Sequence, residues 1–589
     1  MSEGRIVRIG GASGSWGDSP RAIPQLLAAG PDYLMMDFLA EVTMSLLARA
    51  RMKNPDHGFP PDFIGYLKPW LGDIAAKGVK VVSNAGGVNP AACKAAMETV
   101  CAELGLPLRV AMVEGDDVLP LIDGLRATTR EHVTGAPLPD RLLTANAYLG
   151  ALPIKAALAA GADIVITGRC ADSALALGVL MHEFGWAADD YDRLAAGSLV
   201  GHVLECGPQA TGGNHTDWQA VEGWDDIGYP IAECRADGSF VLAKPEGTGG
   251  LITPGVASEQ ILYEIGDPAT YLLPDVVADF SSVTVAQVGP NRVAIGGAKG
   301  RAPTPSYKVS ATWQDGYRAV ATIAIVGPDA VAKTDKVAAA MIGRGRRALA
   351  ERGLPDFTET HVEALGGEAT YGSRARGQAS REVVARVAVA HPDAKALDLF
   401  ARELGFLGLG TAPGVTGFLG GRPQATPVVR LYTFFIDKSA VAAPRVTVGG
   451  DAPFEVPVPL NGAQPPASAE AALGGPTSGG VVEMPLLRLG YARSGDKGDS
   501  ANIAIIARRP EWVEEIRREV TVSRMADVFG ETVAGPIRRY EAPGLHAFNF
   551  LLEGALGGGG MASMRIDPQG KAYGQRALEM IVRVRADLL

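Results

Sequence analysis

The chain has 589 residues, of which 47% are hydrophobic and 20% charged, and its formal net charge is −10. This length predicts two to four domains of average globular composition. No basic patch supports nucleic-acid binding, and no apolar run approaches the ~20 residues of a membrane helix. Five cysteines without a CxxC pair argue against structural zinc or a disulfide framework. With no signal-peptide pattern at the start, we expect a cytoplasmic protein.

Short apolar runs alternate with helical segments over the first 180 residues. Strands separated by helices of ~10–15 residues are typical of a parallel sheet with helices on its faces. In such sheets, ligands bind in loops beyond the carboxyl ends of the strands. The clearest unit is residues 162–177, ADIVITGRCADSALAL, where a strand opens through a charged loop into a helix. The predicted strands are residues 5–9, 33–36, 79–83, 108–113 and 162–167.

The pattern changes beyond residue 180. A polar Gly-rich loop covers residues 207–218, helices are predicted at 329–352 and 392–404, and residues 428–435 form a predicted buried strand. A Pro/Ala/Gly/Ser-rich stretch then indicates a linker before a compact domain of strands and two helices. We therefore predict an α/β protein with an N-terminal parallel β/α sheet lobe (1–270), a mixed α/β second lobe of the same large domain (271–460), a linker (461–482) and a small C-terminal α+β domain (483–589).

Acidic side chains follow several of the predicted strands and are expected at one edge of the sheet. Crowded carboxylates raise one another's pKa and act as general acids or bases, or they bind a hard cation. Helix capping or solvent exposure is the alternative for any single acid. No HExxH or other ordered ligand set predicts a transition-metal site. The acids are Asp37, Glu41, Glu114, Asp116, Asp117 and Asp172, of which Asp37, Glu114 and Asp172 are catalytic candidates.

A GxxGxxG segment begins at Gly11, after the first predicted strand and before a helix. Small residues there let backbone N–H groups approach a phosphate, so Gly11, Ser13 and Gly14 are candidate contacts for a phosphate or for CoA. Asp37 ends the next strand, where a Rossmann fold keeps its ribose-binding acid, but the spacing is not GxGxxG. A structural tight turn and a nicotinamide site are the alternatives.

Further polar residues lie in the predicted strand-end loops. Arg169 could hold a carboxylate or phosphate of a ligand, or it could pair internally with Asp172. Asn84 offers amide donors for a thioester or enolate oxygen, or it could shape a turn. His215 in the Gly-rich loop is a candidate catalytic proton shuttle, against a merely solvated histidine. Cys170 and Cys206 could be nucleophiles or buried inert thiols.

Cationic and mixed-charge loops provide the remaining candidates. Lys244, Lys299 and Arg301 lie in Gly/Pro loops and could bind the phosphates of CoA, although exposed loop cations need no function. In the C-terminal domain, residues 493–502 combine charges with two glycines beyond what a turn requires. This loop could contact the ligand or dock onto the large lobe, through Asp496, Lys497, Asp499 and Asn502.

Several longer blocks occur in order along the chain: RIGGASGSWGDSP, IVITGRCADSALALG, GPQATGGNHTDW, KPEGTGGLIT and GRAPTPSYKV. Together they resemble the acyclic terpene utilisation protein A family. The tail, with YARSGDKGDSANIAIIARRPEW and RYEAPGLHAFNFLLEGALGGGG, looks like the small ferredoxin-like domain fused to this family or encoded beside it. The resemblance implies bacterial breakdown of citronellol and geraniol through acyl-CoA esters, beside biotin-dependent acyl-CoA carboxylases. It implies no catalytic residues.

We therefore expect a protein that acts on a branched acyl-CoA by acid/base chemistry of the hydratase, dehydratase or lyase type. A non-catalytic partner of a biotin-dependent acyl-CoA carboxylase and an NAD(P)-dependent oxidoreductase are the alternatives. No cofactor is firmly implied beyond a CoA thioester as substrate, with a divalent cation as a further option. The expected partners are an acyl-CoA, carboxylase subunits and further copies of the chain in a homo-oligomer, without nucleic acid or membrane.

Overall fold

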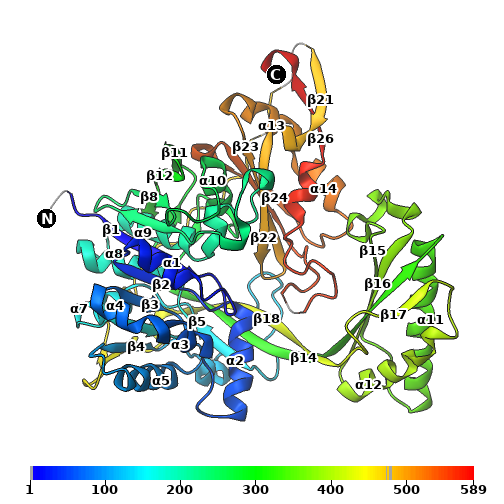
Figure 1. Cartoon of the computed structure of the whole chain (residues 1–589), viewed down its shortest axis with the longest axis horizontal. Coiled ribbons are helices and arrows are strands. Elements are labelled where there is room, and N and C mark those ends of the chain that lie inside the picture. Colours follow the sequence, from blue (N-terminus) through cyan, green and yellow to red (C-terminus); the bar gives the residue numbers. More distant parts are fainter. Residues whose placement is uncertain (1–3, 473, 476–479, 561) are drawn as a thin grey trace.

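The structure of the protein is a computed structural model. It describes residues 4–472, 474–475, 480–560 and 562–589, except for the side chains of Glu41 and Val42. Figure 1 shows an N-terminal lobe, a second lobe joined to it by long strands, and a C-terminal domain above both. Within these segments, no helix is both long enough and apolar enough to cross a bilayer.

A parallel sheet forms the centre of the N-terminal lobe. Its strands are buried almost throughout because helices cover both faces. These parallel strands are the middle of a larger sheet, called the first sheet below, which continues with antiparallel strands on each side. The parallel strands, in spatial order, are β1 (Val7–Ser13), β2 (Tyr33–Met36), β3 (Lys80–Ser83), β6 (Ile164–Thr167) and β4 (Val110–Glu114). This sheet confirms the predicted parallel β/α architecture.

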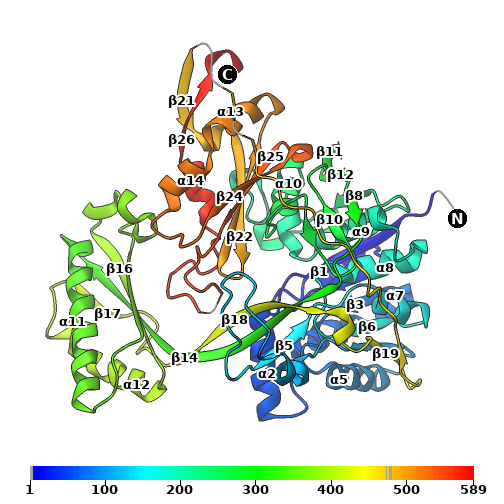
Figure 2. The same ribbon diagram turned by 180° about the vertical axis from the view of Figure 1, so that it is seen from behind.

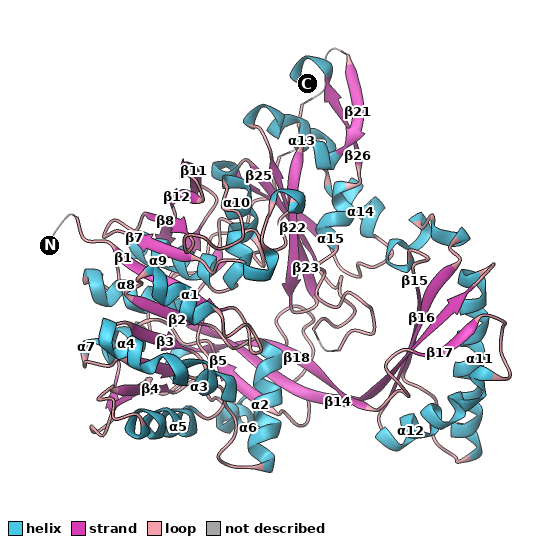
Figure 3. Cartoon of the chain, in the orientation of Figure 1, coloured by secondary structure: helices cyan, strands magenta, loops and turns pink. Residues whose placement is uncertain are grey.

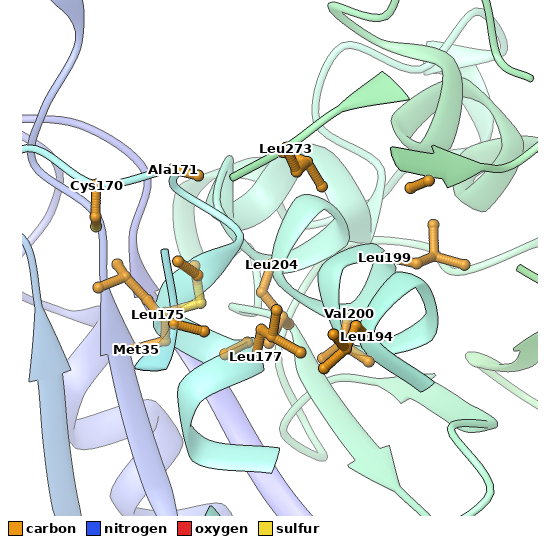
Figure 4. Packing of buried hydrophobic residues seen from close by; sticks show 14 of the residues in the cluster. Met35, Cys170, Ala171, Leu175, Leu177, Leu194, Leu199, Val200, Leu204 and Leu273 are labelled. Carbon is orange, nitrogen blue, oxygen red and sulfur yellow. The ribbon is translucent and has the colours of Figure 1, made fainter. Parts of the chain in front are cut away.

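Helices of two separate hydrophobic clusters cover the two faces of the parallel strands. On one face, Leu175 and Leu177 of α8 and Leu204 of α9 belong to the same cluster as Met35 of β2 (Figure 4). Helices of this face are α7 (Leu152–Ala159), α8 (Ala174–Phe184) and α9 (Tyr191–Leu204). Helices of the other face are α1 (Ala22–Ala29), α3 (Pro61–Leu67), α4 (Leu71–Lys77) and α5 (Pro90–Glu103).

Antiparallel strands extend the first sheet at both edges (Figure 3). Strand β7 pairs with β1, and β19 pairs with β4. The residues predicted as a second lobe therefore contribute to this sheet as well as to the next one. Beyond β1 lie β7 (Ile231–Cys234), β8 (Phe240–Ala243), β12 (Arg292–Gly296) and β11 (Thr284–Gly289); beyond β4 lie β19 (Arg445–Val448) and β20 (Phe454–Glu455).

The long strand β14 (Ser306–Val326) connects the N-terminal lobe to the second lobe, as both views show (Figures 1 and 2). Its first half pairs with β5 (Thr144–Ala147) and β18 (Thr426–Asp437) beside the N-terminal lobe. Its second half pairs with β16 and β17, and β16 also pairs with β15. The second lobe contains α11 (Ala330–Glu351), β15 (Glu359–Leu365), β16 (Glu382–His391), α12 (Ala394–Glu403) and β17 (Val415–Phe418).

The C-terminal domain, here residues 480–589, has its own antiparallel sheet and hydrophobic core. The strand order is β22 (Gly490–Lys497), β23 (Ser500–Ala507), β25 (Ala547–Leu552) and β24 (Ile537–Ala542), and helices α13 (Val513–Glu519), α14 (Val522–Phe529) and α15 (Tyr573–Leu578) complete it. Together with the parallel N-terminal sheet, these elements confirm the predicted α/β class.

Two buried asparagines dock the C-terminal domain onto residues 262–266, which end and follow helix α10 (Pro254–Leu262). The side-chain oxygen of Asn502 accepts a hydrogen bond from the N–H of Glu264 at 3.0 Å, and its amide donates to the carbonyl of Leu262 at 2.8 Å. Asn549 donates to two further carbonyls of this loop at 2.6 Å. Of the two roles predicted for the loop of residues 493–502, ligand contact or docking, Asn502 has the docking role. It lies at the interface between the C-terminal domain and the large lobe.

Asn502→Ala should weaken this interface, because the substitution leaves a buried N–H and a buried carbonyl without partners. Each such loss costs about 1–3 kcal/mol. We expect a lower urea midpoint and faster proteolysis of the linker after residue 461. Asn461→Ala, an exposed position in the linker, is the matched control and should change neither. Unchanged proteolysis in Asn502→Ala would show that other contacts hold the domain.

Candidate active site

A cavity of about 1370 Å³ lies where the N-terminal lobe, strands β14 and β18, and the C-terminal domain meet. Pockets for drug-sized ligands usually measure about 300–1,000 Å³. This cavity therefore has room for a larger ligand. Its wall includes nine of the candidate residues named from the sequence: Gly14, Asp37, Arg169, Asp172, Cys206, His215, Asp496, Lys497 and Asp499.

Arg169 and Asp172 lie in the loop after β6, at the carboxyl edge of the parallel sheet. The buried Arg169 guanidinium forms an ion pair with the Asp172 carboxylate at 2.5 Å and donates to the carbonyl of Leu39 at 3.1 Å. It also lies 4.1 Å from the centroid of the Tyr148 ring. Asp172 keeps 28% of its side chain exposed, so the ion pair fixes the loop while its carboxylate remains at the cavity wall.

Asp37 follows β2 directly and is buried beside this ion pair. Its carboxylate accepts hydrogen bonds from the Asn84 amide at 2.6 Å and from the N–H of Leu39 at 3.1 Å. Burial and repulsion from Asp172 raise the pKa of Asp37 well above its ordinary value, and the Asn84 bond and Arg169 only partly oppose the rise. A carboxyl with a raised pKa is suited to act as a general acid.

Asp116 supports the Arg169 loop from behind the cavity. Its carboxylate accepts a hydrogen bond from the N–H of Arg169 at 2.9 Å and from the amide of Asn146 at 2.8 Å. Burial raises the pKa of Asp116 to about 6. A Cβ atom at Gly168 would lie 2.4 Å from this carboxylate, which explains the glycine in the loop.

Glu205 at the cavity wall lies within hydrogen-bond distance of His202 of α9. Nε2 of His202 lies 3.0 Å from the carbonyl of Ile261, which can only accept, so Nε2 carries a proton. Nδ1 lies 3.0 Å from Glu205, and this contact is a hydrogen bond when one proton lies between the two groups. Burial, with repulsion from Asp172, raises the pKa of Glu205, and His202 opposes the rise. The pair can therefore store one proton next to the cavity.

His215 lies in the Gly-rich loop and is buried against Glu259 of α10. Its Nδ1 is 2.6 Å from the Glu259 carboxylate, which also accepts from the N–H of Thr216 at 3.2 Å and from its hydroxyl at 2.5 Å. A carboxylate that accepts a hydrogen bond from Nδ1–H orients the imidazole ring. The other ring nitrogen, Nε2, is then left for proton exchange with a ligand. His215 lines the cavity in this oriented form.

The C-terminal domain contributes the opposite wall. Lys571 lies 3.4 Å from the carboxylates of both Asp496 and Glu264, and it donates to the hydroxyl of Tyr263. Lys497 lies over the ring of Tyr271 at 5.4 Å. Asp499 accepts a hydrogen bond from the N–H of Gly558 at 2.7 Å and so orders the glycine segment 557–560 at the same wall.

The glycine segment near Gly11 packs tightly against the helical face of the sheet. Gly11 and Ser13 lie within β1, and a Cβ at Gly11 would come within 2.7 Å of the Leu204 carbonyl. The N–H of Gly11 donates to Pro230, and the N–H of Gly14 donates to Asp18. Both amides therefore have protein partners, which favours packing over pyrophosphate binding as the reason for these glycines.

Other predicted ligand contacts lie outside the cavity wall. Asn84 acts through Asp37, and Glu114 at the end of β4 lies 3.4 Å from Arg445. Lys244 donates to the carbonyl of Thr248 at 2.6 Å. Two more cations form exposed ion pairs on the surface: Lys299 with Asp192 at 3.0 Å, and Arg301 with Asp279 at 3.2 Å.

The thiols of Cys170 and Cys206 have raised pKa values, chiefly because of burial, so they lack the thiolate character of nucleophiles. Among the described residues, no group of three His, Cys, Asp or Glu side chains is arranged to hold a metal ion. The side chain of Glu41, another acid predicted for the sheet edge, lies outside the described residues.

Sequence reasoning missed part of the cavity wall. Glu205 precedes the Gly-rich loop, and its proximity to Asp37 depends on how α9 packs over the sheet. Glu264 has a positive φ of 56°, which the sequence around it does not predict. The missed residues of the wall include Glu205, Tyr263, Glu264, Tyr271 and Lys571, whereas Arg493 begins the loop of residues 493–502 that was predicted as a possible ligand contact.

Two family models match the chain. Residues 7–447 match the model described as acyclic terpene utilisation family protein AtuA, and residues 484–583 match the AtuA ferredoxin-like domain. The matches occur in the order predicted from the sequence blocks, which confirms the resemblance. No curated protein and no solved structure matches the chain.

The raised pKa of Asp116 predicts a pH dependence of stability. Between about pH 4 and 6 the unfolded chain has lost this proton while the folded chain retains it, so stability should fall as the pH rises through this window. A shift of about two units corresponds to roughly 3 kcal/mol. Asp116→Asn should remove this part of the slope in urea unfolding measured from pH 4 to 7.

Asp192→Asn is the control for that measurement. Hydrogen bonds from Gly300 and Lys299 lower the pKa of Asp192, so its contribution is lost as the pH falls and its removal should change the slope in the opposite direction. Equal slopes for Asp116→Asn and the unmodified protein would contradict the assignment of the raised pKa to Asp116.

Proposed function

We propose, from the premise that the chain belongs to the acyclic terpene utilisation family AtuA, that it acts on a branched acyl-CoA in acyclic terpene breakdown of the citronellol and geraniol type. The proposed chemistry is proton transfer next to the thioester carbonyl, as in a hydratase, dehydratase or lyase. The observation that carries it is that Asp37, whose buried carboxyl has a raised pKa, lies with the ion-paired Asp172 at one wall of a large cavity.

The two carboxyl groups suit opposite halves of such a reaction, because acid/base assignments follow from groups held in different protonation states. In a dehydration, Asp172 would take the proton from the carbon next to the thioester. Asp37 would give its proton to the departing hydroxyl, which leaves as water. The proton on Asp172 would then return to Asp37, because burial raises the pKa of Asp37. His215 and the His202–Glu205 pair are further proton sites at the wall.

The shape and lining of the cavity support a thioester with an apolar acyl group. Apolar side chains from several elements line it, and each buried CH₂ of an acyl chain contributes about 0.8 kcal/mol. These side chains include Leu39, Leu273, Trp313, Leu431 and Phe435. Cations of the C-terminal domain lie at the same cavity and suit the charged part of such a ligand.

Cofactor and partners complete the proposal. The CoA thioester is the proposed substrate, without a nicotinamide, since the amides of Gly11 and Gly14 are used within the protein. Association with acyl-CoA carboxylase subunits and homo-oligomer formation are proposed from the family. The divalent cation considered from the sequence is not part of the proposal, because no three His, Cys, Asp or Glu side chains among the described residues are arranged to hold one.

Asp37→Asn and Asp172→Asn should retain binding of a branched enoyl-CoA but lose turnover by roughly 10²-fold or more, because each removes one proton-transfer group. Binding is measured as a rise of the melting midpoint over a panel of free CoA, short and branched enoyl-CoAs, NAD(P) and divalent cations. Turnover is measured as hydration or dehydration of the thioester that gives the largest shift.

Glu114→Gln is the matched control, because this acid also ends a parallel strand but lies outside the cavity wall; it should leave turnover unchanged. If no CoA ester raises the melting midpoint, the acyl-CoA proposal fails. Co-purification with carboxylase subunits would then support the non-catalytic alternative.

A further inference from the structure

Arg493 of β22 is a buried cation at the cavity wall, with only 7% of its surface exposed. Its guanidinium donates to the side-chain oxygen of Gln209 and lies 4.4 Å from the centroid of the Tyr263 ring. Within the described part of the chain, no carboxylate lies within ion-pair distance of Arg493. Its charge is therefore held by a neutral amide and an aromatic face.

This arrangement is costly unless a further group neutralises it, because buried charges are normally paired and hydrogen-bonded. A guanidinium has five N–H donors, and Arg493 uses only the one to Gln209 among the described residues. Three other buried arginines have a carboxylate or several carbonyls as partners: Arg169 pairs with Asp172, Arg386 pairs with Glu363, and Arg539 donates to backbone carbonyls.

The acids nearest in the wall already have a cationic partner. Glu264 and Asp496 both lie 3.4 Å from Lys571. Asn502 accepts a hydrogen bond from the N–H of Glu264, whose backbone has a positive φ. The wall of the C-terminal domain therefore offers a guanidinium with N–H donors that no protein acceptor uses among the described residues.

We propose that Arg493 binds an oxyanion of the ligand, either a carboxylate or a phosphate, and so completes the site from the C-terminal domain. The planar guanidinium matches such a group with two parallel hydrogen bonds, and Gln209 and Tyr263 hold its orientation. The inference rests on the proposed function only in assigning this cavity to the substrate. It places the anionic part of the ligand at the domain interface, opposite Asp37 and Asp172.

The test compares anion binding in the full chain and in Arg493→Gln. Sodium phosphate and sodium acetate are the probes, at an ionic strength held constant with sodium chloride. We expect at least one probe to raise the melting midpoint of the unmodified protein, and Arg493→Gln to weaken that binding roughly tenfold or more. Arg493→Lys should weaken it less, because the charge remains while the planar geometry is lost.

Arg508→Gln is the matched control. Arg508 also lies at the domain interface, where it forms two bonds to Asp217 at 2.5 and 2.6 Å, but it is absent from the cavity wall. It should lower stability while leaving the response to the anion unchanged. Should both glutamine variants lose the response equally, the effect belongs to domain docking, and the Arg493 proposal is overturned.

The probes also show whether the oxyanion is a phosphate or a carboxylate. They further distinguish failure of the anion site from failure of the acyl-CoA proposal. A phosphate response, with CoA binding that also weakens in Arg493→Gln, assigns a CoA phosphate; an acetate response assigns a carboxylate of the acyl group. A response to neither anion, or one that Arg493→Gln and Arg493→Lys both retain in full, overturns the anion site. If an anion binds through Arg493 but no CoA ester does, the anion site stands and the acyl-CoA proposal fails.

Discussion

The site depends on the hydrogen bonds that hold the C-terminal domain against residues 262–266. Asn502 and Asn549 satisfy backbone groups of Leu262, Glu264, Ile265 and Gly266 with their side-chain amides, while Tyr263 bonds to Gln260 of its own lobe. Tyr263 and Glu264 belong to the same loop and line the cavity. Because a strained backbone persists only where its surroundings fix it, the docking contact also determines where the Glu264 carboxylate lies.

Electrostatics makes the other side of the cavity suited to proton transfer. Repulsion from Asp172 contributes to the raised pKa values of Asp37 and Glu205, while Arg169 pairs with Asp172 and His202 lies against Glu205. Three buried or half-buried carboxyl groups cannot all ionise cheaply in such a setting, so protons remain bound there. The strand ends fix these positions, because Asp37 follows β2 and Arg169 follows β6 within two residues. The parallel sheet therefore creates the crowding that keeps a proton available.

Periodicity was sufficient to predict the parallel strands and hence the common edge of Asp37, Arg169 and Asp172. It could not predict the antiparallel strand β5, since Thr144–Ala147 is a short run of small and polar residues whose partner β14 lies far along the chain. The phosphate contacts proposed at Lys244 and Lys299 relied on loop composition, whereas their orientation depends on tertiary packing. Likewise, the glycines near Gly11 have a packing explanation that involves α9, about 190 residues away.

The N-terminal lobe and the C-terminal domain contribute different chemical groups to one cavity, and this couples ligand binding to the docking of the domain. The proton-transfer groups belong to the parallel sheet, and Arg493 and Lys571 belong to the C-terminal domain. A ligand that contacts both walls binds only the docked arrangement, so part of its binding free energy stabilises docking. The converse also holds, since docking before ligand arrival orders the loop of residues 262–266 in advance and lowers the entropic cost of binding. Fusion through a linker favours the docked state in the same way, because it raises the effective concentration of the small domain at the open side of the cavity.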